Sequence, residues 1–187
     1  MTELYVAGNS IKDVTPVNVM NLIEKLNLSG NKITDISKLE THKYLTELNL
    51  SNNNISDIKQ LSSFIALEKL FIDNNEVADI NPLVSLKSLT QLGLARNRIS
   101  DIVALKYLNK LTVLALSGNR IKDIKPLKTL YALDSLYLEN NQIDSIEALY
   151  KLEKAKTIVL AGNNLSDAQF EQLRTILQNC DIIKELT

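Results

Sequence analysis

Asparagine recurs at every twenty-second position over most of this chain, and this spacing constrains the fold more than any other feature of the sequence. The eight positions are Asn9, Asn31, Asn53, Asn75, Asn97, Asn119, Asn141 and Asn163. Self-similarity at a fixed period of this length is typical of proteins that stack short structural units. A buried asparagine that follows a short strand can satisfy turning backbone groups with both its carbonyl and its amide. The sequence therefore predicts a repeat architecture in which these asparagines are structural.

Apolar residues keep a constant register to each asparagine. They stand eight, five and three positions before it, as Leu45, Leu48 and Leu50 do before Asn53. This alternation predicts one short strand in each unit. Apolar residues also stand two, five and eight positions after the asparagine, within a DIxxLxxL pattern. That second pattern is too short for a full α-helix and favours a 3₁₀ or single-turn segment.

An aspartate stands just before the second segment in six units. These residues are Asp13, Asp35, Asp57, Asp79, Asp101 and Asp123, and the seventh unit has Ser145 instead. A carboxylate in this position can accept hydrogen bonds from the first free amides of the segment. We therefore interpret these aspartates as caps of the segments that follow them, and not as catalytic acids.

The charge and the apolar content of the chain limit which kinds of molecule it is expected to bind. Lysine and arginine number 21 against 22 aspartates and glutamates, so the net charge of −1 gives no reason to expect a nucleic acid partner. No apolar run approaches the roughly 18 residues of a membrane span, and the first residues lack the regions of a secretory signal. We expect no membrane insertion, and a cytoplasmic location if the chain is complete. The single cysteine, Cys180, cannot form an internal disulfide and is expected to pack against apolar neighbours.

At this point the units resemble leucine-rich repeats of the 22-residue kind. Segments 75–86 (NEVADINPLVSL) and 119–130 (NRIKDIKPLKTL) are similar to the NxIxDIxPLxxL units of bacterial internalins. The period is also similar to that of the phosphatase regulatory subunits of the eukaryotic cytosol. The resemblance covers residues 4 to about 165. It implies an α/β repeat solenoid, a right-handed horseshoe with a parallel concave sheet and short 3₁₀ or turn segments on the convex side.

The last part of the chain differs from the repeats. We predict eight units over residues 1–165 and a C-terminal capping helix and tail over residues 166–187. The run from Ser166 to Gln169 is a capping-box sequence. An apolar stripe follows it, made of Phe170, Leu173, Ile176 and Leu177. We expect this stripe to cover the core of the last repeat.

The first repeat has no equivalent cover in the sequence. Its strand begins at Leu4, and no upstream segment is expected to shield four apolar residues: Leu4, Val6, Ile11 and Val14. An exposed apolar edge of this kind favours pairing with another chain. We therefore predict either a truncated chain or an end-to-end contact through the uncapped N-terminal repeat.

The single histidine, His42, is the only residue whose side chain suggests a catalytic or metal-binding role. It occupies a column otherwise filled by apolar residues such as Phe64 and Leu86, and no second histidine or cysteine is placed to join it. We interpret His42 as a core or border residue. The sequence therefore predicts no catalytic residue, no metal site and no cofactor.

The strand residues that point away from the core stand six, four and two positions before each asparagine. In successive units the middle of these three columns holds Phe71, Gly93, Ala115 and Tyr137. The two aromatic residues are three strands apart, roughly 14 Å at about 4.8 Å per strand. We predict that these two aromatic walls flank a shallow trough on the concave face.

Charged residues stand in the same repeats as the trough. Asp73 and Glu139 follow the two aromatic residues on their strands, and three of the four arginines lie at the loop edge beside them. Aromatic residues and arginine are enriched at interface hot spots. The predicted partner-binding residues are Phe71, Asp73, Arg96, Arg98, Arg120, Tyr137 and Glu139, with the two aromatic residues as anchors. The alternative is ordinary surface variation, in which Arg98 pairs with Glu76 for about 0 to 1 kcal/mol.

The leading functional prediction is a non-catalytic scaffold that binds a protein partner on its concave face. Three alternatives remain open: the repeat portion of a larger internalin-like surface or secreted protein, the repeat portion of a multidomain enzyme, and an intracellular adaptor of the phosphatase-regulator type. A surface or secreted location follows if the chain is a fragment of an internalin-like protein. A consensus-derived design is disfavoured by irregular core residues such as His42 and Phe64.

Overall fold

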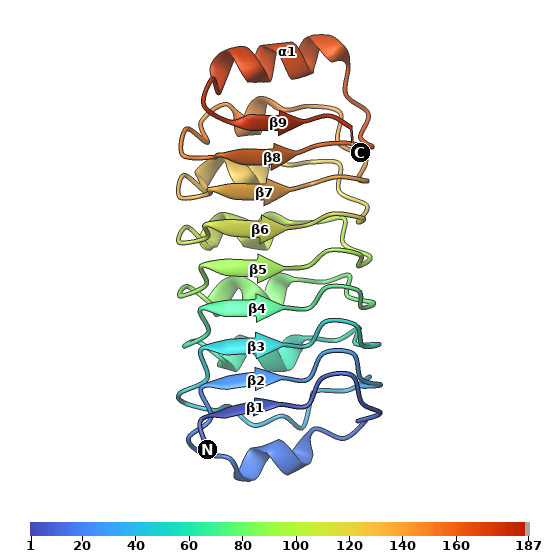
Figure 1. Cartoon of the computed structure of the whole chain (residues 1–187), viewed down its shortest axis with the longest axis vertical. Helices are drawn as coiled ribbons and strands as arrows, with labels where there is room; N and C mark the ends of the chain where they lie inside the picture. Colours follow the sequence, from blue (N-terminus) through green and yellow to red (C-terminus); the bar gives the residue numbers. More distant parts are fainter. Residues whose placement is uncertain (186–187) are drawn as a thin grey trace.

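The computed structural model describes residues 1–185 and contains one open parallel sheet of nine strands in that range (Figure 1). The strands pair in chain order, each with the next. They are β1 (Glu3–Tyr5), β2 (Lys25–Asn27), β3 (Glu47–Asn49), β4 (Lys69–Phe71), β5 (Gln91–Gly93), β6 (Val113–Ala115), β7 (Ser135–Tyr137), β8 (Thr157–Val159) and β9 (Asp181–Ile183). From β1 to β8 the register sets equivalent repeat positions side by side, as in Lys69 beside Gln91, so each sequence column is a column in space.

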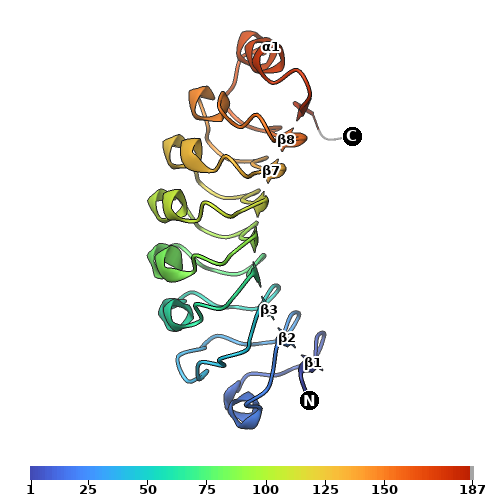
Figure 2. The ribbon, with the colours of Figure 1, turned by 90° about the vertical axis from the view of Figure 1, so that its left-hand side faces the viewer.

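Short 3₁₀ helices form the second half of most repeats. They are η1 (Thr15–Val19), η2 (Lys59–Ser63), η3 (Asn81–Ser85), η4 (Val103–Tyr107), η5 (Lys125–Thr129) and η6 (Glu147–Leu149). Figure 2 shows them along the convex side of a gently curved stack whose strands line the concave side. The second repeat has a turn at residues 37–38 in this place. The predicted leucine-rich repeat solenoid with a concave parallel sheet is thus confirmed.

The six aspartates that precede these segments act as predicted, one residue earlier than a standard N-cap. Asp79, for example, accepts the amide of Asn81 at 2.9 Å, while the N-cap position itself is held by Ile80. The other five each accept the amide two residues ahead. Because each carboxylate satisfies the first amide of its segment, it fixes where the convex turn begins.

The core is one continuous apolar column that runs the length of the stack. The repeated leucines and isoleucines are almost all inaccessible to solvent, and together they form a single cluster from Val14 to Ile182. No unit can bury these side chains alone, because each is covered only by the units on either side. Stability is therefore shared along the array.

The asparagines join each repeat to the previous one, and Asn97 shows the pattern. Its Oδ1 accepts the amide of Val77, 3.0 Å away in the preceding repeat. Its Nδ2 donates to the carbonyl of Ile72 in that repeat at 2.9 Å, and to the carbonyls of Leu94 and Ala95 in its own. Asn31, Asn53, Asn75, Asn119 and Asn141 are buried in the same way. The asparagine side chain thus supplies the hydrogen bonds that a neighbouring strand would otherwise make, at the point where the strand ends and the chain turns.

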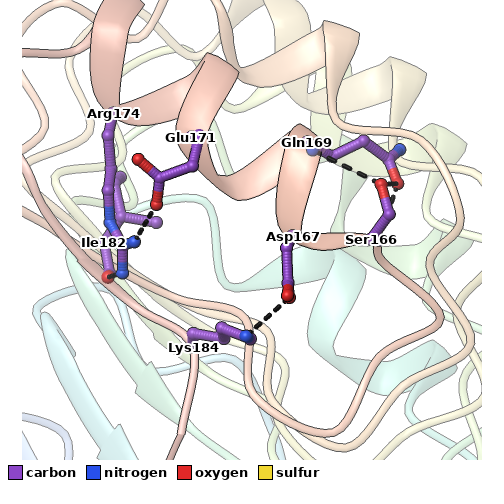
Figure 3. Close-up of polar contacts among 7 residues, drawn as sticks. All are labelled: Ser166, Asp167, Gln169, Glu171, Arg174, Ile182 and Lys184. Atoms are coloured by element: carbon purple, nitrogen blue, oxygen red, sulfur yellow. Dashed lines mark hydrogen bonds and ion pairs between the residues drawn. The ribbon is translucent and has the colours of Figure 1, made fainter.

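The C-terminal end is closed by a helix, as predicted. The helix α1 (Asp167–Ile176) begins with a complete capping box between Ser166 and Gln169. It is also tied to the chain that follows: Lys184 pairs with Asp167 at 2.6 Å, and Arg174 donates to the carbonyl of Ile182 at 3.2 Å (Figure 3).

Two details of this end differ from the sequence prediction. The strand β9 pairs with β8 inside the segment predicted as helix and tail, the last two residues of which lie outside the described part of the chain. Of the predicted apolar stripe, Phe170, Leu173 and Leu177 are buried, but Ile176 is 41% exposed. The prediction for Ile176 was therefore wrong, because it lies at the end of the helix, on the side that faces solvent.

The N-terminal repeat is partly open. Leu4, Val6 and Ile11 are half-buried against the core, whereas Val19 is 80% exposed. Val14 was predicted to be exposed and is only 2% exposed, so that part of the prediction was wrong. The reason is that Val14 packs into the core cluster that continues into the second repeat. The end-to-end contact stays a prediction. Within residues 1–185 no helix has the length and apolarity needed to cross a membrane.

We expect the Asn97→Ala variant to lose about 1 to 3 kcal/mol of unfolding free energy, because the buried Val77 amide would lose its acceptor and the Ile72 carbonyl would keep only one of its two donors, Asn75. Urea denaturation followed by circular dichroism measures this loss. Asn9→Ala is the matched control, since Asn9 is exposed and its amide bonds only within its own repeat. Equal losses for the two variants would contradict the inter-repeat role.

Candidate functional site

The predicted trough lies on four neighbouring strands of the concave face. The register places Phe71 beside Gly93, Gly93 beside Ala115, and Ala115 beside Tyr137. Both aromatic side chains are half-buried, which leaves part of each ring available to a partner. The order across β4 to β7 is therefore aromatic, small, small, aromatic, as the sequence predicts.

Asp73 is used inside the scaffold. Its Oδ1 accepts the amide of Ala95 at 2.8 Å, and its Oδ2 accepts the hydroxyl of Ser51 at 3.3 Å. The carboxylate lies over Gly93, where any Cβ atom would overlap it. Gly93 thus leaves room for Asp73, whose carboxylate occupies part of the space at the β4 side of the trough. The role of Asp73 as a contact residue stays a prediction.

Arg96 has a backbone conformation that is unfavourable for its residue type. The residue before each ladder asparagine adopts a positive φ, and in most repeats it is glycine or asparagine: Gly8, Gly30, Asn52, Asn74, Gly118, Asn140 and Gly162. Arg96 occupies the same place with φ 54°. For a residue with a long side chain this left-handed conformation costs roughly 1 to 2 kcal/mol. Such local strain is concentrated at functional sites.

The three predicted arginines have different surroundings. Arg98 forms an ion pair with Glu76 at 3.0 Å. Arg96 and Arg120 are exposed, and within residues 1–185 neither has a carboxylate within ion-pair distance. The Arg96 stem extends over Gly118 in the next repeat, with its Cγ 3.3 Å from the place that a Cβ on Gly118 would take. Two free guanidinium groups therefore remain at the loop edge of neighbouring repeats.

Glu139 lies on the strand side of the same edge. It is half-buried, and its Oε2 is shielded from solvent without a hydrogen-bond donor in the described part of the chain. A shielded acceptor without a donor costs about 1 to 3 kcal/mol. Like the strain at Arg96, this is a local cost that the scaffold does not require, since the same column holds Ala95 and Ser117 in other repeats.

The structure thus gathers the predicted residues in repeats four to seven, on the concave face and its adjoining loop edge. Residue type and register indicated the trough. They did not indicate the strain at Arg96, although the signal was present in the sequence: the column before the asparagines holds only glycine and asparagine from residue 30 onward, apart from this arginine.

Comparison with known proteins agrees with this architecture. The family model described as Leucine Rich repeats (2 copies) matches residues 21–64, 43–85, 65–107 and 109–151, which together make up more than half of the chain. The chain belongs to the leucine-rich repeat family. A comparison with curated protein sequences finds no significant match.

Several solved leucine-rich repeat structures are similar to the chain. The internalin InlF of Listeria monocytogenes has a TM-score of 0.93 and 28% identity, and the match covers 98% of this chain and 54% of that one. The internalin InlC2 of the same organism has a TM-score of 0.93 and 27% identity, over 98% of this chain and 80% of that one. The ectodomain of the receptor kinase GASSHO1/SCHENGEN3 of Arabidopsis thaliana, solved with CASPARIAN STRIP INTEGRITY FACTOR 2, has a TM-score of 0.81. At 23% identity, over 97% of this chain and 24% of the receptor, that last likeness shows the fold alone.

Cys180 and His42 are the two remaining residues with potentially reactive side chains in this leucine-rich repeat array, and both are at least partly buried. Burial raises the pKa of the Cys180 thiol to about 11, helped by the nearby Asp181, so the thiol is protonated and a poor nucleophile at neutral pH. His42 is 5% exposed, and its Nε2 has no hydrogen-bond partner in residues 1–185. Burial lowers the pKa of His42, against the opposing effects of Glu40 and the backbone of Met20. Across the same residues, no group of three or more His, Cys, Asp and Glu side chains is placed to hold a metal ion.

The His42→Leu variant tests this interpretation through pH. Because the folded-state pKa of His42 is lowered, the unfolded chain binds the proton more readily, and the wild type loses stability as the pH falls through the unfolded value near 6.5 toward the lower folded value. Leucine removes this loss. We expect the variant to gain stability over the wild type, and the gain to be larger at pH 5 than at pH 7.5 in thermal unfolding. A gain that does not change with pH would show that His42 is solvated in the folded state.

Proposed function

We propose that this leucine-rich repeat protein is a non-catalytic scaffold whose concave face binds a protein partner. The observation that carries the proposal is the register of β4 to β7, which sets Phe71 and Tyr137 on either side of Gly93 and Ala115. Ala115 leaves room for a partner backbone between the two aromatic anchors, while the Asp73 carboxylate covers Gly93 at the β4 side. Aromatic anchors of this kind carry much of the binding energy in protein interfaces.

The chemistry of the face supports binding over catalysis. The carboxylates beside the trough have different surroundings: Asp73 is held by an amide and a hydroxyl, and one oxygen of Glu139 is shielded. Within residues 1–185 neither carboxylate is hydrogen-bonded to a histidine, lysine or cysteine side chain, a pairing on which many acid–base and nucleophilic mechanisms depend. Reproducible turnover in a hydrolase or kinase screen would overturn the non-catalytic part of the proposal.

The replacement of both Phe71 and Tyr137 by alanine tests the proposed face. A partner is first isolated with the wild-type chain and identified by mass spectrometry, and its affinity is then measured by calorimetry. We expect the double variant to weaken binding by about 2 kcal/mol or more, roughly thirtyfold in Kd, while the thermal midpoint stays nearly unchanged.

The control replaces Tyr107 and Tyr131 by alanine, since both tyrosines are exposed and lie outside the concave strands. Unaltered binding in the Phe71 and Tyr137 variant, or a loss in the control alone, would place the interface elsewhere. A large loss of thermal stability in the former would mean that its aromatic side chains are structural.

A second proposal follows from the internalin likeness. The chain spans 54% of InlF and 80% of InlC2, at about the same identity. This favours the view that the repeats are the binding portion of a longer internalin-like surface or secreted protein over the enzyme and phosphatase-adaptor alternatives. The sequence of the complete gene decides between them.

A further inference from the structure

The loop edge beside the trough carries three arginines, two of which have no ion-pair partner within residues 1–185. Arg96, Arg98 and Arg120 lie in two successive repeats, and of these only Arg98 has an ion-pair partner, Glu76, within residues 1–185. Arg96 and Arg120 therefore carry two positive charges that no carboxylate in residues 1–185 pairs with. Lys122, two residues after Arg120, differs from it because it is paired with Asp144 at 3.1 Å.

Arg96 also occupies its position at the expense of stability. Seven repeats place glycine or asparagine there, so the fold has no need of an arginine, and the left-handed backbone makes arginine less favourable than glycine. The benefit of the guanidinium group must therefore come from something outside the array. The Arg96 stem extends over Gly118, toward the repeat that contains Arg120. This arrangement brings two unpaired guanidinium groups to neighbouring repeats.

We infer that the partner of the concave face is a protein segment that places an acidic side chain against Arg96 and Arg120, next to apolar residues in the trough. This inference rests on the proposed function, because it concerns the same face. A planar guanidinium group binds carboxylates through two parallel hydrogen bonds, which suits an edge that carries two such groups in neighbouring repeats.

The rest of the site disfavours a phosphate polymer. Asp73 and Glu139 lie two residues beyond the ends of β4 and β7, beside the same trough, where they would repel a continuous negative backbone. Ala115 leaves an apolar space beside Tyr137 at the β7 side of the trough, away from the Asp73 carboxylate that covers Gly93, and this space suits an apolar side chain. A segment with acidic and apolar residues side by side satisfies both parts of the surface, whereas a nucleic acid or free phosphate satisfies only the arginines.

The test is a selection of short random peptides displayed on phage against the whole chain, followed by Kd measurements on the recovered peptides. We expect the recovered peptides to carry Asp or Glu next to aromatic or aliphatic residues. The variant with both Arg96→Gly and Arg120→Gln should weaken their binding at least tenfold. Arg96→Gly alone should also raise the thermal midpoint, because glycine removes the strain at φ 54°. A loss of binding together with a gain in stability cannot come from damage to the fold.

Two control variants match these changes. Asn74→Gly makes the same backbone change in the preceding repeat without removing a charge, and Lys125→Gln with Lys128→Gln removes two positive charges from η5 on the convex side. Both should bind the peptides as the wild type does. Inorganic phosphate and duplex DNA serve as competitors and should not displace the peptides at physiological salt.

The outcomes separate this inference from the function on which it rests. If Phe71→Ala with Tyr137→Ala abolishes binding but the arginine variant does not, the concave face binds protein and the acidic inference is wrong. Peptides without an acidic bias, displacement by phosphate or DNA, no recovered peptide, or a fall in the thermal midpoint of Arg96→Gly would each overturn the inference. If neither pair of residues affects binding, both proposals fail.

Discussion

Each buried asparagine side chain binds two successive repeats together where the strand ends. Its Oδ1 accepts an amide of the preceding repeat, and its Nδ2 is shared among carbonyls of both repeats, as at Asn97. These backbone groups cannot reach water, and a buried group without a partner is costly. The chain must therefore return an asparagine to the same place in every unit. This requirement fixes the repeat length, and the repeat length aligns the side-chain columns.

The same requirement restricts the residue before the asparagine. The backbone turns there with a positive φ, which glycine and asparagine tolerate best. Arg96 is unfavourable at this point, and it lies beside the strands β4 to β7, where two aromatic residues flank two small ones in register. Natural proteins often break a local rule at a functional site and keep their stability through the rest of the fold. In a stack with a continuous core, one strained residue is easily tolerated.

Most of the fold could be predicted from the sequence because its information is periodic. Leu45, Leu48 and Leu50 alternate in one strand, and the same alternation recurs beside each later asparagine, so strands, core and convex turns follow from one register. The strand β9 could not be found in this way, because no asparagine follows it and the helix before it shifts its distance from β8. The strand β9 forms because the backbone groups at the outer edge of β8 still need hydrogen-bond partners, which the C-terminal segment supplies.

The part of the site that could be predicted also follows from the repeat register. The positions of Phe71 and Tyr137 depend only on register, and register is what the repeat determines. The use of Asp73 within the scaffold depends on a side chain that reaches into the space above Gly93, and this contact between neighbouring repeats has no periodic signal. Likewise, only the structure shows that Arg120 has no ion-pair partner within residues 1–185.

Native-state hydrogen exchange tests the central claim most directly, because it observes the backbone amides that donate only to an asparagine side chain. The amides of Ile33, Ile55, Val77, Ile99 and Ile121 each donate to the Oδ1 of an asparagine at 2.9 to 3.0 Å. If the asparagines join the repeats, these five amides exchange as slowly as those of the central strands β4 to β6. Exchange at the rate of exposed loops would contradict the account.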